Sequence, residues 1–319
     1  LVEPPALEGL QTFPVTVEGD DVMVEVGEDA GPVRQPEVAR RDPENRRTAV
    51  VLGGGAAGGA AVQELRRAGF SGRVVMITAD DLAACERAHC SKHYLEGAAP
   101  EEWLPLKPAA FWEQADIEKI SDQVHEVDVR ERVVRLPQGA VLTADVLLLA
   151  MGAQPNRLEV PGADLGGVHT LRTWRDADAI IGDADDARSA VVVGASFIGM
   201  EAASSLRGRG IGSVTVVAPE DIPFGRVLGE RIGHSIQHLH EDNGVDFELG
   251  SGVAALVGDG SVREVELDDG RRLEAELVVV GIGVRPATDI VRGVELEADG
   301  SLLTDEMMRV AEGVFAAGD

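Results

Sequence analysis

Lysine is almost absent from this sequence, and aromatic residues are scarce. Only three of the 29 basic side chains are lysines (Lys92, Lys107 and Lys119), and 56 acidic residues give a formal net charge of −27. A chain of this charge repels nucleic acids and anionic membrane surfaces, so we expect neither as a partner. Aromatic residues make up 3% of the chain. The hydrophobic cores must therefore be built mainly from alanine, valine, leucine and isoleucine.

Cysteine and long hydrophobic runs are scarce as well. Two cysteines, Cys85 and Cys90, are too few for a disulfide framework, which favours a cytoplasmic protein. No apolar run is long enough to span a membrane, and no charged-then-apolar leader opens the chain. The chain has 319 residues, 44% of them hydrophobic, which is enough for two domains with separate cores.

The stretch from Thr48 to Gly58 has the order of a dinucleotide-binding turn. Residues 48–52 form a short β-branched and apolar run, Gly53-x-Gly55-x-x-Gly58 follows at once, and a helical pattern comes next. The first glycine permits a tight turn, the second lets the backbone approach a pyrophosphate, and the third lets the helix pack close to the strand. The free N–H groups of the helix N-terminus suit phosphates. Alone the motif is weak, because consecutive glycines also form plain loops.

An acidic residue follows the second expected strand of this unit. Residues 73–78 are predicted to form that strand, and Asp80 lies 22 residues beyond Gly58. An acid at this spacing accepts hydrogen bonds from the adenosine ribose hydroxyls of a bound dinucleotide. An ordinary aspartate at a strand end is the alternative, and the spacing favours the ribose role.

A second unit of the same kind begins near residue 190. Residues 190–193 predict a strand, Gly194-Ala-Ser196-Phe-Ile198-Gly199 predicts the turn and helix start, and residues 213–217 predict the next strand. Ser196 replaces the middle glycine. Two strand–turn–helix units 141 residues apart form an internal repeat. We therefore predict an α/β fold with two Rossmann-like nucleotide-binding domains.

The first 45 residues have a different sequence pattern from the two glycine units. Residues 14–26 alternate in polarity on both sides of Gly19-Asp20, which predicts a β-hairpin. Residues 27–45 are rich in proline, glycine and charge, which predicts a linker.

Three further motifs, taken with the two glycine turns, resemble a known family. They are Ala150-Met151-Gly152, Gly281-Ile-Gly283-Val-Arg-Pro286 and the closing Phe315-Ala-Ala-Gly-Asp319. Their order resembles the FAD-dependent pyridine nucleotide reductases, in the branch of oxygenase-coupled ferredoxin reductases and apoptosis-inducing-factor-like proteins. The resemblance covers about residues 48–319 and implies a glutathione-reductase-like fold.

This resemblance implies a domain organisation. Residues 48–155 and 284–319 would form a discontinuous FAD-binding domain, and residues 156–283 an NAD(P)H-binding domain. Residues 1–30 look like the C-terminal hairpin of a Rieske domain, followed by a linker at 31–47. A [2Fe–2S] cluster is expected only upstream of Leu1, and the family's C-terminal domain, often its dimer contact, only beyond Asp319. Cys90-x-x-His93 has the spacing of one cluster ligand pair but lacks a second pair, so no metal site is predicted.

The first turn would hold FAD. The resemblance implies that Gly53, Gly55 and Gly58 cradle its pyrophosphate and that Asp80 binds its adenosine ribose.

The segment from residue 85 to residue 92 is similar to the family's Asp-Arg-Pro-x-Leu-Ser-Lys. There Arg87 would neutralise phosphate charge, and Lys92 would reach the flavin near N5 and stabilise its reduced, anionic form. Gly152 would lie at the crossing between the domains, and Asp319 would hydrogen-bond the ribityl chain.

The second turn would hold the nicotinamide nucleotide. Gly194 and Gly199, together with Ser196 and Ile198 between them, would bind its pyrophosphate. Glu201 would face the nicotinamide region, and it joins Lys92 as a candidate catalytic residue.

The choice between NADH and NADPH depends on the end of the following strand. Glu220 is the nearest acid for the ribose, and residues 218–222 contain no basic side chain to hold a 2′-phosphate. Arg226 is the nearest candidate for that task, so NADH is favoured over NADPH. Gly283 belongs to the glycine-rich break where the second domain would end.

The resemblance implies a reductase that passes electrons from NADH through flavin to a Rieske or ferredoxin-type iron–sulfur acceptor; a homodimer is compatible with it. One alternative is a flavin thiol–disulfide reductase using Cys85 and Cys90, whose spacing suits a redox-active dithiol. Another is a weakly catalytic, apoptosis-inducing-factor-like flavoprotein that binds nucleotides. Departures from the family pattern favour that last alternative: Ala84, Ala88, Met151 and Val310.

Overall fold

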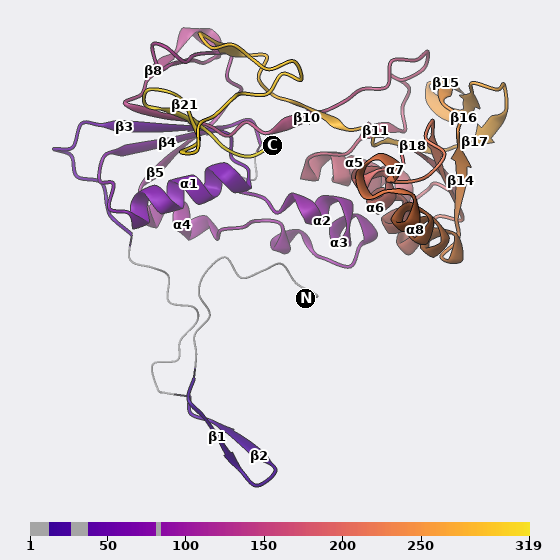
Figure 1. The fold of residues 1–319 in the computed structure, drawn as a ribbon, viewed down its shortest axis with the longest axis horizontal. Coiled ribbons are helices and arrows are strands. Elements are labelled where there is room, and N and C mark those ends of the chain that lie inside the picture. Colours follow the sequence, from indigo (N-terminus) through magenta and orange to yellow (C-terminus); the bar gives the residue numbers. More distant parts are fainter. Residues whose placement is uncertain (1–12, 27–37, 81–83) are drawn as a thin grey trace.

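A computed structural model describes residues 13–26, 38–80 and 84–319. Figure 1 shows two α/β units side by side and a hairpin that lies apart from both. Each unit has a mainly parallel sheet with helices on one face and a smaller, mainly antiparallel sheet on the other. The predicted α/β fold with repeated Rossmann-like units is confirmed.

The first unit is built on a six-stranded sheet. Its order is β21 (Arg309–Ala311), β22 (Val314–Ala316), β9 (Val146–Leu149), β3 (Thr48–Leu52), β4 (Arg73–Thr78) and β5 (Ile117–Ser121), parallel except for the β21–β22 pair. Successive side chains of β3 point to opposite faces. Ala49 and Val51 pack against α1 (Ala56–Arg67) and α4 (Ala109–Gln114). Val50 and Leu52 face the second layer of the unit.

That second layer is a four-stranded sheet. Its order is β20 (Val291–Arg292), β6 (Glu126–Asp128), β7 (Val133–Arg135) and β8 (Val141–Thr143). Val127 and Val134 from this sheet are fully buried against Val50 and Val75 of the large one. A valine core of this kind agrees with the shortage of aromatic residues.

The second unit repeats the arrangement. Its five-stranded sheet is parallel, in the order β11 (Val168–Thr170), β18 (Leu277–Val280), β12 (Ser189–Val193), β13 (Ser213–Ala218) and β14 (Val245–Leu249). One face packs on α5 (Trp174–Ala184), α6 (Phe197–Arg209) and α8 (Glu230–Asp242). The other face packs on an antiparallel meander of β15 (Val253–Asp259), β16 (Ser261–Leu267) and β17 (Arg272–Glu274).

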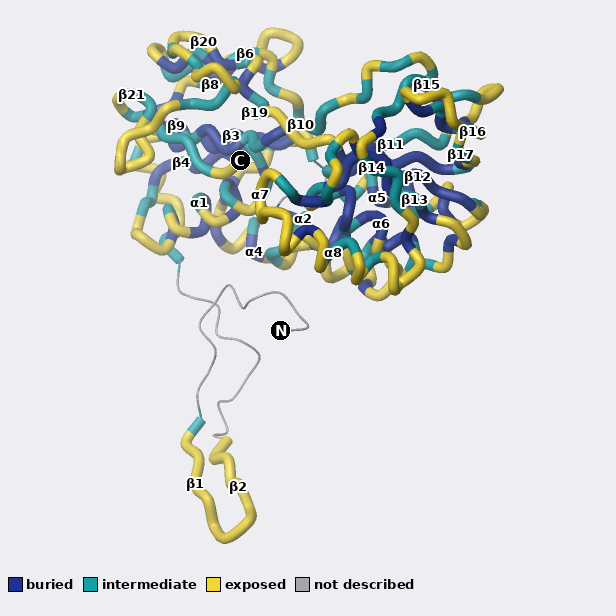
Figure 2. The backbone as a smooth tube through the Cα atoms, turned by 45° about the vertical axis from the view of Figure 1, so that its right-hand side comes forward, coloured by how far each residue is buried: buried dark blue, intermediate teal, exposed yellow. Residues whose placement is uncertain are grey.

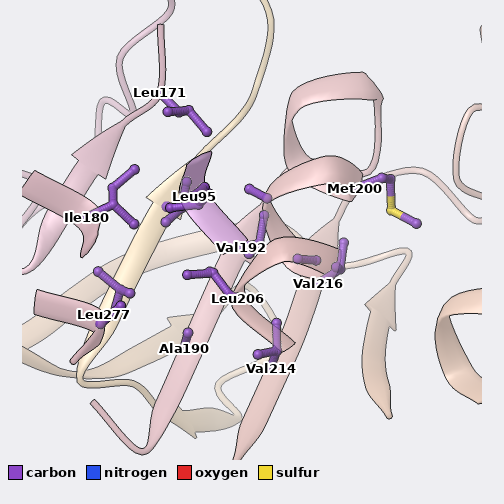
Figure 3. Packing of buried hydrophobic residues seen from close by; sticks show 14 of the residues in the cluster. Leu95, Leu171, Ile180, Ala190, Val192, Met200, Leu206, Val214, Val216 and Leu277 are labelled. Atoms are coloured by element: carbon purple, nitrogen blue, oxygen red, sulfur yellow. The ribbon is translucent and has the colours of Figure 1, made fainter. Parts of the chain in front are cut away.

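Two features join the units. The chain passes between them twice, through β10 (Ala153–Pro155) and β19 (Val284–Pro286), which pair antiparallel. In addition α2 (Arg87–Ser91) and α3 (His93–Glu96), which follow the first glycine unit in the chain, pack on α5 and α6. Figure 3 shows Leu95 among Ile180, Val192 and Leu206 of the second unit. Residues of α2 and α3 thus belong to the hydrophobic core of the second unit, and we call this contact between the units the joint.

The N-terminal hairpin is confirmed, with β1 (Val15–Glu18) and β2 (Asp21–Val24) joined at Gly19-Asp20. Every residue of both strands is exposed, as the yellow tube in Figure 2 shows. The expected linker lies partly outside the described residues. Its described part does not run free, because Val38 packs on the first unit and Asp42 N–H donates to Ser71 O. Within the described residues, no helix is long and apolar enough to cross a membrane.

Candidate functional site

Both glycine turns bring two chain segments into close backbone contact. Gly53 has φ +107°, and a Cβ there would lie 2.0 Å from the carbonyl oxygen of Ala150. Gly194 has φ +112°, and its Cβ would lie 2.4 Å from the oxygen of Gly281. Each turn thus depends on a residue without a side chain and with a left-handed backbone. Each also brings the predicted motif beside the end of a neighbouring strand, β9 or β18.

The third glycine of each motif lets the helix approach its own turn. A Cβ on Gly58 would lie 1.9 Å from Gly53 O, and a Cβ on Gly199 would lie 2.0 Å from Gly194 O. The middle position is different, because a Cβ on Gly55 would meet no atom within 4 Å. Open space at that position explains how the second turn accommodates Ser196.

The helices that begin at these turns have free N-termini. The N-cap residues of α1 and α6, Gly55 and Ser196, make no side-chain capping hydrogen bond, and neither first turn holds an acidic residue. In α5, by contrast, Thr173 and Asp176 form a capping box. Uncapped N–H groups with the positive end of the helix dipole suit an anion such as a pyrophosphate. The residues present at both turns therefore fit a dinucleotide. Ile198, in the first turn of α6, packs on the core and leaves this N-terminus open.

Asp80 and Arg87, two of the predicted FAD ligands, contact each other. Arg87 Nη2 donates to Asp80 Oδ2 at 2.9 Å, and both side chains remain about 30% exposed. The pair lies where the chain passes from the end of β4 into α2. The carboxylate keeps lone pairs for ribose hydroxyls, and the guanidinium keeps donors for a phosphate.

The two candidate catalytic residues also meet, although they come from different units. Lys92 Nζ lies 2.8 Å from Glu201 Oε1, with the lysine 45% and the glutamate 28% exposed. Lys92 stands at the junction of α2 and α3, and Glu201 lies on α6 close to the second glycine turn. The ion pair therefore spans the joint between the two units.

Arg172 is a site residue that the sequence reasoning missed. Its guanidinium contacts the carboxylate of Asp319, and a Cβ on Gly152 would lie 3.5 Å from Arg172 Nη2. Its Nε is buried without a hydrogen-bond partner among the described residues. A signal was present, because Arg172 directly precedes the capping box of α5 at the carboxyl end of a parallel strand, where α/β proteins bind ligands.

A cavity of about 280 Å³ lies beside these residues. Its lining includes Met151, Gly152, Thr304, Met308 and Asp319. The backbone of Gly318 approaches the start of α1, with a Cβ placed 3.3 Å from Ala57 Cβ. The crossing at Gly152 and the end of the described chain thus meet at one cavity next to the first glycine turn.

The remaining residues predicted to hold the nicotinamide nucleotide lie at the second turn and the crossing. Glu220 follows β13 and has Arg226 Nη2 3.8 Å from its carboxylate; Arg226 is 84% exposed. Gly283, with φ +93°, accepts the N–H of Asn156 where the chain returns to the first unit. The sequence reasoning gave no role to Phe197, which is half-exposed at the start of α6 and packs edge-on against Phe224 at 5.0 Å between ring centroids.

The two cysteines are placed in the core of the joint. Cys85 and Cys90 are free thiols, 7% and 1% exposed, in the cluster that also contains Leu95 and Leu104. The hydrogen bond between the two thiols lowers the pKa of Cys85 and, together with burial, raises the pKa of Cys90. The two sulfurs are thus neighbours, as the dithiol alternative requires. Their burial, however, restricts access of a disulfide substrate to either thiol.

Comparisons with known proteins agree with this geometry. A family model described as pyridine nucleotide-disulphide oxidoreductase matches residues 47–319. The chain is 36% identical over 330 residues to apoptosis-inducing factor 3 of Mus musculus, covering 99% of this chain and 53% of that protein. It is 32% identical to the benzene 1,2-dioxygenase system ferredoxin–NAD(+) reductase subunit of Pseudomonas putida, covering 81% of this chain and 63% of the relative.

Among solved structures, the covalent putidaredoxin reductase–putidaredoxin complex is similar with a TM-score of 0.81 and 28% identity. That match covers 86% of this chain and 68% of the other. The chain thus spans only about half to two thirds of the length of these relatives.

Proposed function

The chain belongs to the pyridine nucleotide-disulphide oxidoreductases, a family that binds FAD and NAD(P)(H), and we propose that it is an FAD-dependent reductase using NADH. Its electrons go to an iron–sulfur acceptor of the Rieske or ferredoxin type. One observation carries the proposal. Two uncapped, glycine-based helix N-termini lie in adjoining units, and an ion pair between Lys92 and Glu201 links them.

In this proposal residues 48–155 and 284–319 hold FAD. The N–H groups at the start of α1 bind the pyrophosphate, Asp80 binds the adenosine ribose, and Arg87 binds a phosphate. Asp319, oriented by Arg172, hydrogen-bonds the ribityl chain. A bound flavin supplies hydride acceptance from NADH and release of electrons one at a time. Lys92 contributes a cation that stabilises negative charge on the reduced ring.

Residues 156–283 hold the nicotinamide nucleotide in the same proposal. The start of α6 binds its pyrophosphate, and Phe197 offers an apolar surface beside that turn. Glu220 accepts hydrogen bonds from ribose hydroxyls and repels a 2′-phosphate. Arg226, the nearest basic side chain, has its guanidinium 3.8 Å from the Glu220 carboxylate, so a 2′-phosphate there would also face that carboxylate. We therefore propose NADH as the donor.

The acceptor is inferred from relatives. The Pseudomonas putida relative is named as a ferredoxin–NAD(+) reductase subunit, and the solved complex contains putidaredoxin. The hairpin β1–β2 is fully exposed, and an isolated two-stranded hairpin is at best marginally stable, so it needs further strands to pair with. From the family resemblance we assign it to the end of a Rieske-type domain. Assembly as a homodimer and a cytoplasmic location, which suits the two free thiols, belong to the same proposal.

The test is anaerobic reduction of the FAD-loaded protein, followed by flavin absorbance. NADH should bleach the flavin, and NADPH should do so at least about tenfold less efficiently. Addition of an oxidised ferredoxin should then restore the absorbance. A protein that binds both cofactors without bleaching would be a nucleotide-binding flavoprotein and not a reductase. Exchange of Glu220 to Gln serves as the matched variant, and it should narrow the preference for NADH.

A further inference from the structure

Ser91 contacts Glu201 across the joint and directly precedes Lys92 in the chain. Its Oγ donates to Glu201 Oε2 at 2.6 Å, while the other oxygen of that carboxylate, Oε1, lies 2.8 Å from Lys92 Nζ. Both oxygens of Glu201 are thus engaged by consecutive residues of one segment. Of these two contacts to Glu201, the one from Ser91 is the more rigid, because Ser91 is only 7% exposed.

The backbone around Ser91 is itself held from the second unit. Ser205, on α6, donates its hydroxyl to the carbonyl oxygens of Ser91 at 2.8 Å and of Lys92 at 3.2 Å. This bond lies at a sharp break between α2 and α3, where Lys92 has φ −119° and ψ −111°. The hydroxyl of Ser91 therefore starts from a fixed backbone, and its bond to Glu201 has a defined direction.

A carboxylate held at one oxygen only rotates about its last side-chain bond. Terminal sp³–sp² torsions of this kind are broad, so an ion pair alone does not fix the carboxylate plane. The hydroxyl of Ser91 removes that freedom and leaves Oε1 directed at the ammonium group. Lys92 is 45% exposed and has a long, flexible stem, so its position depends on the carboxylate that receives it.

We propose that Ser91 is a positioning residue for Lys92. It fixes the carboxylate of Glu201, and that carboxylate in turn fixes the ammonium group where the proposed flavin site needs a cation. The expected effect of this positioning on catalysis rests on the proposed function. The positioning itself is a property of the chain and is measured without cofactor.

The first experiment measures competitive labelling of lysine by an amine-reactive acylating reagent, read by mass spectrometry. The chain has only Lys92, Lys107 and Lys119, so each lysine is resolved on its own peptide. In Ser91→Ala the labelling rate of Lys92 should rise about threefold, as expected when a partly exposed ion pair loosens. Lys107 and Lys119 should keep their rates, and Ser91→Thr should restore the slow rate of Lys92.

Two further variants serve as a positive and a negative control for the labelling of Lys92. Glu201→Gln should raise the labelling of Lys92 at least as much as Ser91→Ala, and the exposed Ser235→Ala on α8 should leave it unchanged. An unchanged Lys92 rate in Ser91→Ala, with Glu201→Gln fast, overturns the proposal. So does an unchanged rate in both, because the ion pair then does not hold Lys92.

The second experiment measures flavin reduction by NADH in the loaded protein. Ser91→Ala should slow reduction about tenfold, the lower end for loss of a supporting contact, and Ser91→Thr should recover it. Failure of the wild-type protein to be reduced by NADH would count against the proposed function and leave the labelling result standing. If Ser91→Ala is reduced at the normal rate although its Lys92 is labelled fast, the positioning of Lys92 by Ser91 does not contribute to flavin reduction.

Discussion

Arg87 Nη2 lies 2.9 Å from Asp80 Oδ2, so two residues expected to bind different parts of FAD bind each other. Their pairing holds the Asp80 carboxylate at the end of β4, next to the first glycine turn. Each residue still has polar atoms free for a ligand.

We predict that Asp80→Ala weakens FAD binding about tenfold, or 1.4 kcal/mol, through loss of the ribose hydrogen bonds and release of Arg87. Quenching of flavin fluorescence on titration measures the dissociation constant. Asp186→Ala removes the same charge from an exposed position and should leave binding unchanged. Equal losses in the two variants would show that only net charge matters.

Lys92→Ala tests the cation at the joint. Loss of the ammonium group should slow reduction of the bound flavin by NADH tenfold or more, on the order of 1.4 kcal/mol in the barrier. Anaerobic stopped-flow absorbance gives the rate. Lys119→Ala on the edge strand β5 is the matched control and should behave like the wild type. The assignment fails if Lys92→Ala is reduced at the normal rate.

The first glycine turn offers a pair of substitutions with opposite expected results. Gly58→Ala places a Cβ 1.9 Å from Gly53 O and should destabilise the protein by about 1–3 kcal/mol, the usual cost of overpacking. Gly55→Ala meets no protein atom within 4 Å, so it should keep the stability and weaken FAD binding only. Urea unfolding and flavin titration measure the two effects. A stable Gly58→Ala would contradict the packing at this turn.

The strands and both turns follow from sequence because their causes are local. Apolar runs such as residues 146–149 and 277–280 have few alternatives to buried parallel strands, and a glycine with φ near +110° leaves a visible mark in the sequence. The contact between Lys92 and Glu201 has no such mark, and only the family resemblance placed both near the flavin. The hydroxyls of Ser91 and Ser205 give no signal at all, because serine occurs throughout loops and helix ends.

Arg172 and the two cysteines also show that sequence spacing alone does not predict tertiary contacts. Arg172, just after β11, contacts Asp319, which lies 147 residues later in the chain. No spacing rule predicts a contact over that distance. Cys85 and Cys90 have a spacing that suggested a redox pair, yet tertiary packing buries both among leucines of the joint. In each case the decisive information is which elements pack together.

Arg66 is a fully buried charge with a structural task. Its guanidinium donates to four carbonyl oxygens, those of Phe70, Gly72, Ala115 and Asp116, and so ties the end of α1 to the end of α4. Arg66→Met leaves the buried carbonyls of Gly72 and Ala115 without this donor and the half-buried pair at Phe70 and Asp116 dependent on water, so we predict a loss of about 3–5 kcal/mol in the free energy of unfolding.

The adjacent Arg67→Met is the control for Arg66. It removes the same charge from an exposed side chain that pairs with Glu64 at 3.0 Å, and it should cost under about 1 kcal/mol. Urea denaturation followed by circular dichroism compares the two. Similar midpoints would mean that water replaces the guanidinium at the four carbonyls.

His89 should make the stability of the joint depend on pH. The ring is 5% exposed, and its Nε2 has no hydrogen-bond partner among the described residues. Burial lowers the pKa of His89, and His93 and Lys92 lower it further against the opposing effect of Glu86. Below the unfolded value, about 6.5, the unfolded chain therefore binds more protons than the folded one at this position. Stability should fall as pH drops through 6.5 toward the lower folded pKa.

His89→Gln removes this titration and should flatten the dependence between about pH 5 and 7, above the range where carboxylates titrate. The urea midpoint measured at several pH values gives the slope. His238→Gln, on the exposed face of α8, is the matched control and should retain the wild-type slope. A His89→Gln variant that loses stability toward acid as steeply as the wild type would show that other groups set the dependence in this range.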